Sequence, residues 1–417
     1  MEVNRMEQAT VLDPAFDVRD QLAAKSGVFE SIDKIWFKKL ASAVIDADRC
    51  VKCGACIAAC PSNSIGIAED YKPTLVKMCT GCSFCWDICP RGGLRYERLW
   101  KILSGDEGAK GIGVVRDAYT ARALKPSPCA QDGGVVTAIV EALLKAGEVD
   151  GAILARRAGS PFRGEAYIAK TVEEVRASAG SVYDQTLNLS KLLDVSSYGQ
   201  RSDVRLALVG VPCQIAGLRF LQRFGWKYRK VNACSVKYTI ALMCTRNFHS
   251  GRLIYALKNV GVNLSRIKKM DVKNNVVQLY DENGETIFKS DVRPFRDAAL
   301  KGCDECADFS GRLADISVGS VGSLRGYSSI LIRTPQGERA WNIAKDSLEY
   351  RRLDDMEGIF RVEQRKLKKV LKELKRGFDP DAPLWICYKD HLTSYAGTER
   401  TPVKPMSYRI HHYDITC

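Results

Sequence analysis

Cysteine is the residue type whose number and spacing stand out in this chain of 417 residues. Of its 16 cysteines, half lie between residues 50 and 89. They form two runs of one pattern, Cys-x2-Cys-x2-Cys-x3-Cys-Pro. The first run consists of Cys50, Cys53, Cys56 and Cys60, and the second of Cys79, Cys82, Cys85 and Cys89. Closely spaced thiolates of this kind are ligands for soft transition metals and for iron–sulfur clusters.

Two such runs are the signature of a bacterial-type ferredoxin module with two 4Fe–4S clusters, and they imply one-electron transfer. Three thiolates in a tight loop occupy three corners of one cubane, and the fourth, beyond the turn, reaches the other cluster. The predicted ligand sets are therefore Cys50, Cys53, Cys56 and Cys89 for one cluster, and Cys79, Cys82, Cys85 and Cys60 for the other. A zinc site usually pairs two Cys-x2-Cys units across a longer spacer and fits the pattern poorly.

Composition places the chain among globular proteins of a reducing compartment. Hydrophobic residues make up 46% and charged residues 27%, and the first residues lack the basic start and apolar run of a signal peptide. A secreted disulfide scaffold is therefore disfavoured, and no apolar stretch is long enough to span a bilayer. We expect a cytoplasmic protein, or one peripheral to the cytoplasmic face of a membrane complex. The net charge of +14 predicts acidic partners, but the chain has no nucleic-acid-binding motif, so nucleic acid is not an expected partner.

The distribution of residue types divides the chain into five segments. A linker is predicted where glycine and small residues concentrate, in SGDEGAKGIG. The N-terminal extension includes FESIDKIWFKKL, which resembles a short amphipathic docking segment. The expected segments are an N-terminal extension (1–40), the ferredoxin domain (41–103), the linker (104–118), a large domain (119–345) and a basic helical C-terminal extension (346–417).

The large domain alternates between helical and strand patterns, which predicts a mixed α/β fold with antiparallel portions. A helix is expected after Gly133 and Gly134, with Gly147 as its C-cap. Strands are expected at 149–157, at 203–210 before a helix, and twice within 315–334, and a hairpin at 270–288 with Asn283 and Gly284 in its turn. A helix over 362–376 either packs through its apolar stripe or docks on a partner or an anionic surface.

Three features of the large domain contain residue types that can bind a cofactor or a metal or can act as a nucleophile. The run from Gln131 to Gly134 opens a helix, where free amides suit a phosphate or an isoalloxazine edge, although Asp132 can equally be an ordinary N-cap. Cys213 stands at a strand-to-helix turn but has no evident activating histidine. Cys303 and Cys306 form a Cys-x2-Cys pair that is either redox-active or metal-binding. Neither a Walker A motif nor a G-x-G-x-x-G fingerprint is present.

Taken in order, these elements resemble the beta subunit of coenzyme F420-reducing hydrogenase and its relatives. The matching stretches are CAQDGGVVTAIVEALL (129–144), GSVYDQT (180–186), ALVGVPCQIAGLR (207–219), ALMCTRNF (241–248) and GCDECADFSGRLADISVGSVGS (302–323). The resemblance implies FAD as cofactor and coenzyme F420 as substrate. It implies a third 4Fe–4S cluster on Cys213, Cys244, Cys303 and Cys306; the residues alone allow such a set of four thiolates, and buried core cysteines are the less favoured alternative. It implies a flavin near Gln131, Asp132, Gly133, Gly134, Thr137, Ser181 and Tyr183.

One position departs from the family pattern. Relatives usually have lysine where this chain has Val182, so the cation that would help to hold the flavin or the coenzyme phosphate must come from elsewhere, and Arg156, Arg157 and Arg163 are the candidates. No role is matched to Cys129, Cys234, Cys387 and Cys417.

The resemblance implies an oxidoreductase of the F420H2 dehydrogenase or F420 hydrogenase beta-subunit type. Such a protein transfers hydride between coenzyme F420 and FAD and passes single electrons through 4Fe–4S clusters to a redox partner or a larger oxidoreductase complex. The alternatives are a hydrogenase or formate dehydrogenase beta subunit, a ferredoxin-dependent reductase of another substrate, and a non-enzymatic electron-transfer module.

Overall fold

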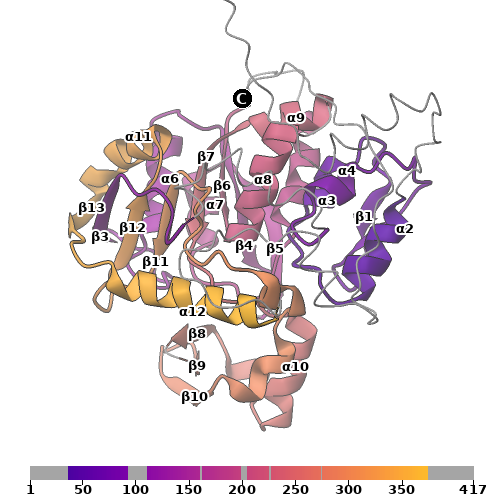
Figure 1. Cartoon of the computed structure of the whole chain (residues 1–417). Coiled ribbons are helices and arrows are strands. Elements are labelled where there is room, and N and C mark those ends of the chain that lie inside the picture. The colour runs from indigo at the N-terminus through magenta and orange to yellow at the C-terminus, as the bar shows by residue number, and fades with distance from the viewer. Residues whose placement is uncertain are drawn as a thin grey trace, which may run out of the picture.

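The computed structural model describes residues 36–92, 110–159, 162–198, 204–224, 227–273 and 275–373. Within these ranges the strands form an eight-stranded sheet, a three-stranded sheet and a two-stranded hairpin (Figure 1). The order in the main sheet is β13-β3-β12-β11-β7-β6-β4-β5. Its strands are β3 (Asp117–Ala123), β4 (Gly151–Arg157), β5 (Gly164–Ala169), β6 (Leu206–Gly210), β7 (Val236–Leu242), β11 (Ile316–Gly319), β12 (Ser328–Ile332) and β13 (Leu348–Arg352).

The centre of this sheet is parallel and its margins are antiparallel. Strands β4, β6, β7 and β11 pair in parallel, whereas β5, β12, β3 and β13 join antiparallel. The predicted mixed α/β class is therefore confirmed, as are the strands expected around 149–157, 203–210 and 315–334. Parallel strands are buried on both faces, which explains why β6 reads as an unbroken apolar run.

Helices cover both faces of the main sheet. The helices of the large domain are α6 (Val135–Lys145), α7 (Val172–Ala177), α8 (Pro212–Phe224), α9 (Lys227–Cys234), α10 (Ser250–Asn259) and α11 (Pro335–Ala344). Helix α6 follows Gly134 and has Gly147, at φ +65°, just beyond its end, as predicted. It packs with α11 on one face around Ile139 and Trp341. Helix α8 packs on the other face through Ile215 and Leu218.

The expected hairpin at 270–288 is a three-stranded antiparallel sheet. It consists of β8 (Lys269–Lys273), β9 (Val276–Tyr280) and β10 (Thr286–Asp291), with β9 in the centre. The turn at Gly284 is confirmed, at φ +79°. The strand that the prediction merged with its neighbour is β8, because Asn275 reverses the chain in the left-handed region at φ +63°.

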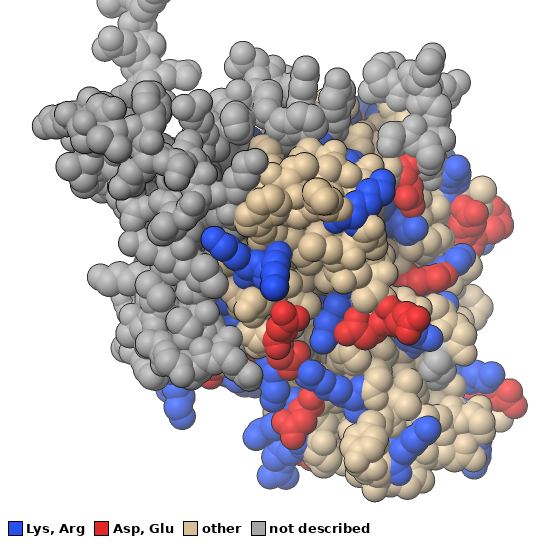
Figure 2. Space-filling view, turned by 90° about the vertical axis from the view of Figure 1, so that its right-hand side faces the viewer, with Lys and Arg blue, Asp and Glu red and all other residues tan. Residues whose placement is uncertain are grey.

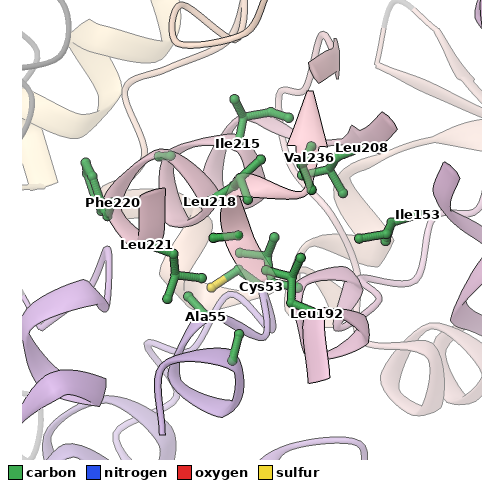
Figure 3. Packing of buried hydrophobic residues seen from close by; sticks show 14 of the residues in the cluster. Cys53, Ala55, Ile153, Leu192, Leu208, Ile215, Leu218, Phe220, Leu221 and Val236 are labelled. Atoms are coloured by element: carbon green, nitrogen blue, oxygen red, sulfur yellow. The ribbon is translucent and has the colours of Figure 1, made fainter. Parts of the chain in front are cut away.

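The ferredoxin module shares its core with the large domain. Its elements are α2 (Phe37–Leu40), a π-helical turn (Ala41–Asp46), α3 (Ala55–Ala59), β1 (Ile65–Ile67), β2 (Pro73–Leu75) and α4 (Phe84–Ile88). Figure 3 shows Cys53 and Ala55 of the module packed against Leu218, Leu221 and Leu192 of the large domain. Of the expected N-terminal extension, only residues 36–40 lie within the described ranges, and residues 93–103 of the module and 104–109 of the linker lie outside them.

The C-terminal part of the fold differs from the predicted extension. Residues 348–352 form β13, which pairs with β3, so the main sheet continues beyond residue 345. Helix α12 (Glu357–Glu373) begins earlier than expected and is packed by its apolar stripe, with Leu367, Val370 and Leu371 buried. Among the described residues, no helix is both long and apolar enough to cross a bilayer.

Candidate functional site

Four thiols of the ferredoxin module gather beside the N-terminus of α3. Burial raises the pKa of Cys50 to about 11 and that of Cys53 to about 12, and repulsion from the Cys89 thiolate adds to both shifts. Burial likewise raises the pKa of Cys56, followed by repulsion from the other three thiolates. We call these residues the first thiol group: Cys50, Cys53, Cys56 and Cys89.

A second set surrounds the N-terminus of α4. Burial raises the pKa of Cys85, and the thiolates of Cys82, Cys79 and Cys60 raise it further. The second thiol group is Cys60, Cys79, Cys82 and Cys85. The fourth cysteine of each run therefore joins the other run's group, as the spacing predicts. Helices α3 and α4 begin alike, after the left-handed residues Gly54 and Ser83, and this turn folds each triplet back on itself.

Backbone amides donate to sulfurs in both of these groups, and the two groups adjoin. Lys52 donates its amide hydrogen to the Cys50 sulfur at 3.4 Å, and Ser64 donates to the Cys60 sulfur at 3.3 Å. Such bonds stabilise the negative charge of thiolate ligands. The thiolate of Cys85 contributes to the raised pKa of Cys56 after burial and the nearer thiols, so the first and second groups adjoin.

The third set of thiols is assembled by the sheet. Cys213 follows β6 and Cys244 follows β7, and because these strands are parallel neighbours their carboxyl ends meet at one edge. Cys303 and Cys306 flank the end of a 3-10 turn, Lys301–Glu305. Burial raises the pKa of Cys244 to about 12, with repulsion from Cys303 and Cys306. The third thiol group is Cys213, Cys244, Cys303 and Cys306.

The third and first groups are neighbours. Burial raises the pKa of Cys213, and the next largest cause is the thiolate of Cys53, ahead of the members of its own group. The approach is close because Gly217 on α8 faces the module: a Cβ added there would lie 3.1 Å from the Cβ of Ala55 and 4.0 Å from the Cys53 sulfur.

A buried arginine cluster fastens these two groups together. Arg49, which precedes Cys50, donates from Nε to Glu305 Oε1 at 3.0 Å, and both side chains are 0% exposed. Arg49 also donates to the Arg91 carbonyl at 2.9 Å, and Arg91 donates to the Gly302 carbonyl at 2.8 Å. Sequence reasoning missed these residues. Their only local signal is an arginine adjacent to each end of the cysteine pattern.

A cavity of about 960 Å³ opens beside the third thiol group. Cys244 lines it directly, together with six of the seven residues expected near a flavin: Gln131, Asp132, Gly134, Thr137, Ser181 and Tyr183. The exception is Gly133, which does not line the cavity. It faces β3 instead, where an added Cβ would lie 2.5 Å from the Ala121 carbonyl oxygen.

The polar groups of the cavity suit a flavin. Within the described residues, Gln131 Nε2 is a buried amide nitrogen without a hydrogen-bond partner, while Gln131 Oε1 accepts from the Ser181 amide at 3.4 Å. A buried donor of this kind is costly unless a ligand accepts from it. Tyr183 accepts from the Val272 amide at 3.0 Å, and burial followed by the Asp271 carboxylate raises its pKa, so its phenol stays neutral. The residues present therefore fit a ring with carbonyl acceptors.

The cations of the cavity come from elements other than those expected. Val182 lines it, as the departure from the family pattern implies, but Arg156, Arg157 and Arg163 are not among the lining residues. Lys273 of β8 does line the cavity, and it donates to Asp132. The basic lining residues are Arg246, Lys273, Arg296, Lys301, Arg365, Lys366 and Lys369.

On the face that carries the ferredoxin module, basic side chains are interspersed with acidic ones (Figure 2).

Of the four unmatched cysteines, the two within the described residues belong to none of the three thiol groups. Cys129 is exposed and Cys234 is buried, whereas Cys387 and Cys417 lie outside the described residues.

Three family models match the chain. Residues 118–194 and 203–356 match the N-terminal and C-terminal models of the coenzyme F420 hydrogenase/dehydrogenase beta subunit, and residues 43–95 match a 4Fe-4S dicluster domain. These matches confirm the resemblance drawn from the sequence and the iron–sulfur module.

Curated relatives and a solved structure agree with the family models. Over 273 residues the chain is 30% identical to the beta subunit of coenzyme F420 hydrogenase from Methanococcus voltae, covering 63% of this chain and 94% of that protein. It is 29% identical to a subunit of the F(420)H(2) dehydrogenase of Methanosarcina mazei, covering 73% and 85%. It is 30% identical to coenzyme F420-dependent sulfite reductase of Methanocaldococcus jannaschii, covering 80% of this chain but 51% of that protein. A chain of the F420-reducing [NiFe] hydrogenase complex from Methanosarcina barkeri superposes with a TM-score of 0.59 at 27% identity, covering 63% and 92%.

Proposed function

The chain belongs to the family of coenzyme F420 hydrogenase/dehydrogenase beta subunits, and from that premise we propose that it is an electron-input subunit like that of F420H2 dehydrogenase. Its substrate is a coenzyme of the F420 class, its cofactors are FAD and three 4Fe–4S clusters, and it delivers electrons to a redox partner or a larger complex. The three thiol groups are the ligand sets of the clusters. The cavity holds the flavin and admits the deazaflavin ring.

The observation that carries this proposal is the continuity from cavity to surface. Cys244 lines the cavity and belongs to the third thiol group. Cys213 of that group adjoins Cys53 of the first, and Cys56 of the first adjoins Cys85 of the second. The second group reaches the surface at Cys82, which is exposed. A cavity joined to an exposed thiol by successive sets of four thiols is what an electron pathway requires.

The chain's own residues bind and orient the reactants. FAD, when bound, supplies the exchange between a hydride on the deazaflavin side and two single electrons on the cluster side. Gln131 Nε2 would donate to a carbonyl of the flavin ring, and the neutral phenol of Tyr183 keeps the β8 strand at the cavity wall through Val272. The basic lining residues attract the anionic phosphate and carboxylates of the coenzyme. This steering predicts that binding of the reduced coenzyme weakens as ionic strength rises.

Electrons leave the chain at the second thiol group. Beside it, Met78 is 90% exposed and Val76 is 56% exposed, and the Met78 carbonyl accepts from Ser64 Oγ at 2.7 Å. Ser64 in turn donates its amide to the Cys60 sulfur. Exposed apolar side chains this close to a terminal redox group favour docking of an electron-accepting protein there.

The test is anaerobic purification followed by iron, sulfide and flavin quantification, together with an assay that uses reduced F420 and a viologen dye. We expect about twelve irons and one FAD per chain, and turnover of the dye. Cys303→Ala should remove about four irons and abolish dye reduction. The matched control is Cys129→Ala, because Cys129 is exposed and belongs to no thiol group, and it should leave both values unchanged.

Two results would contradict the proposal in different ways. About eight irons and no flavin spectrum would identify a non-enzymatic electron-transfer module. Full cofactor loading without turnover of reduced F420 would mean that the cavity serves another electron donor.

A further inference from the structure

Helix α12 brings a basic side chain to the third thiol group from outside the family match. The matched region ends at residue 356, and α12 spans Glu357–Glu373. Figure 1 shows this helix running along the lower edge of the main sheet, between that sheet and the small sheet β8–β10. The helix contacts the turn that carries Cys303. Its position beside the cavity is therefore a feature of this chain that the family match does not include.

The helix is fixed firmly in this place. Glu363 accepts from the amides of Phe309 and Ser310, both at 3.0 Å, and pairs with Arg312 at 3.0 Å in a setting where both side chains are nearly inaccessible. Leu367 and its apolar neighbours on the helix pack against Ala307. All these partners lie within six residues of Cys306 in the sequence, so α12 and the third thiol group are positioned by the same segment.

Lys366 projects from this helix toward the thiols. Its Nζ donates to the Cys244 carbonyl and to the Asp308 carbonyl, both at 2.7 Å. It also lines the cavity. Two hydrogen bonds to the backbone keep the ammonium within the third thiol group's surroundings rather than in solvent. These two bonds favour the ammonium form, because a charged donor bonds a carbonyl more strongly than a neutral amine does.

A fixed cation changes the energetics of electron uptake. Reduction adds one negative charge to a cluster and forms or breaks no bond, and a nearby positive charge in a poorly solvated setting stabilises that added charge. Net charge and hydrogen bonding around the sulfurs are the known determinants of cluster potential. Arg246 and Lys369 also lie near, but both pair with Asp304, which reduces their effect.

We propose that Lys366 sets the reduction potential of the third thiol group's 4Fe–4S cluster, raising it so that this cluster takes up the first electron leaving the cavity. Lys366 acts by holding a positive charge beside this cluster, and it takes no part in hydride transfer. The inference rests on the proposed function, because it requires a cluster on Cys213, Cys244, Cys303 and Cys306.

The test is a reductive titration of the full holoprotein, followed by electron paramagnetic resonance. The signal of the third cluster is identified as the one that Cys303→Ala removes. Lys366→Met should lower its midpoint potential by at least a tenfold change in the one-electron equilibrium constant, which corresponds to about 59 mV, and leave the other two clusters unshifted. Lys366→Gln, which keeps a hydrogen-bond donor without the charge, should shift it in the same direction. Lys366→Arg, which keeps the positive charge, should leave the midpoint potential of the third cluster near its wild-type value.

The matched control is Lys372→Met, on an exposed position of the same helix that does not line the cavity, and it should leave all three potentials unchanged. An unshifted third cluster in Lys366→Met overturns the inference and leaves the proposed function intact. Loss of that cluster's iron from the Met and Gln variants, but not from Arg, also overturns it by assigning Lys366 to holding the site together. A wild-type protein without the third cluster removes the inference and the proposed function together.

Discussion

The first and third thiol groups are built in opposite ways. The first group comes almost entirely from one tight loop and a short helix, within a repeated spacing that is visible in the sequence. The third group takes Cys213 and Cys244 from the ends of two parallel strands, and its remaining cysteines from a turn much further along the chain. A local loop assembles the first group, whereas the topology of the main sheet assembles the third.

This difference decides what each group depends on. Local spacing brings the first triplet of thiols together whenever the loop can fold around its cluster. The third group exists only when β6, β7 and the Lys301–Glu305 turn are all in place, so distant packing and buried charges control it. The Arg49–Glu305 ion pair joins the residue before Cys50 of the first group to the turn that carries Cys303 of the third. Loss of this pair should therefore disturb both groups.

The largest effect should follow from Glu305→Gln. Removing the carboxylate breaks the buried ion pair between Glu305 and Arg49, and breaking such a pair from one side typically costs about 3–5 kcal/mol. We expect that loss in the free energy of unfolding, measured by anaerobic urea titration, together with preferential loss of the third group's iron.

Glu357→Gln is the control for Glu305→Gln, because Glu357 forms an exposed pair with Arg361 and should change stability by less than about 1 kcal/mol. If Glu305→Gln removed iron equally from all three groups, the distinction between locally built and topologically built groups would be wrong.

A smaller effect should follow from Gly54→Ala, which tests how independent the first group is of the large domain. Gly54 has φ +85°, and an added Cβ would lie 2.8 Å from the Ser190 amide nitrogen and 2.9 Å from the Leu187 carbonyl oxygen. Backbone strain and steric overlap together should cost about 2–4 kcal/mol in the free energy of unfolding.

Gly147→Ala is the matched control for Gly54→Ala. Gly147 also has a positive φ, at +65°, but an added Cβ would meet nothing within 4 Å, so only the strain of about 1–2 kcal/mol should appear. Equal losses in the two variants would show that contact with residues 187–190 does not constrain the module.

What the sequence could predict follows the same division. The cysteines of the two ferredoxin groups were predictable because their partners are near in sequence and the spacing is itself the geometry. The third group was reached only by resemblance, since nothing local relates Cys213 to Cys303. Helix α6 and strands β4, β6, β11 and β12 were predictable from periodicity and turn residues.

The parts that were missed depend on long-range partners. Arg49 and Glu305 are 256 residues apart, and no pattern in the sequence marks either as a buried ion pair. In helix α12, the apolar stripe at Leu367 is visible in the sequence, but Lys366 beside it reads as one more solvated cation. Only the position of α12 against Cys244 gives that lysine a different setting. The replacement of the expected arginines by Lys273 has the same cause, because β8 reaches the cavity from a separate sheet.

The smallest effect concerns the cavity, where a single hydrogen bond is at issue. Gln131→Leu removes the buried Nε2 donor that has no partner within the described residues, while it keeps a side chain of similar size. In the proposed function a bound flavin would accept from this donor, so its loss should weaken FAD binding by about 0.5–1.5 kcal/mol, or roughly two- to tenfold. The measurement is FAD binding to flavin-depleted protein by fluorescence. Stability of the flavin-free chain serves as the internal control and should change little, since the unpaired Nε2 donor and the Oε1 acceptor of the Ser181 amide are lost together. A variant that binds FAD as tightly as the wild type would show that the ring carbonyl lies away from Gln131. The part of the cavity lined by Cys244 of the third thiol group would then be the better candidate for the flavin's position.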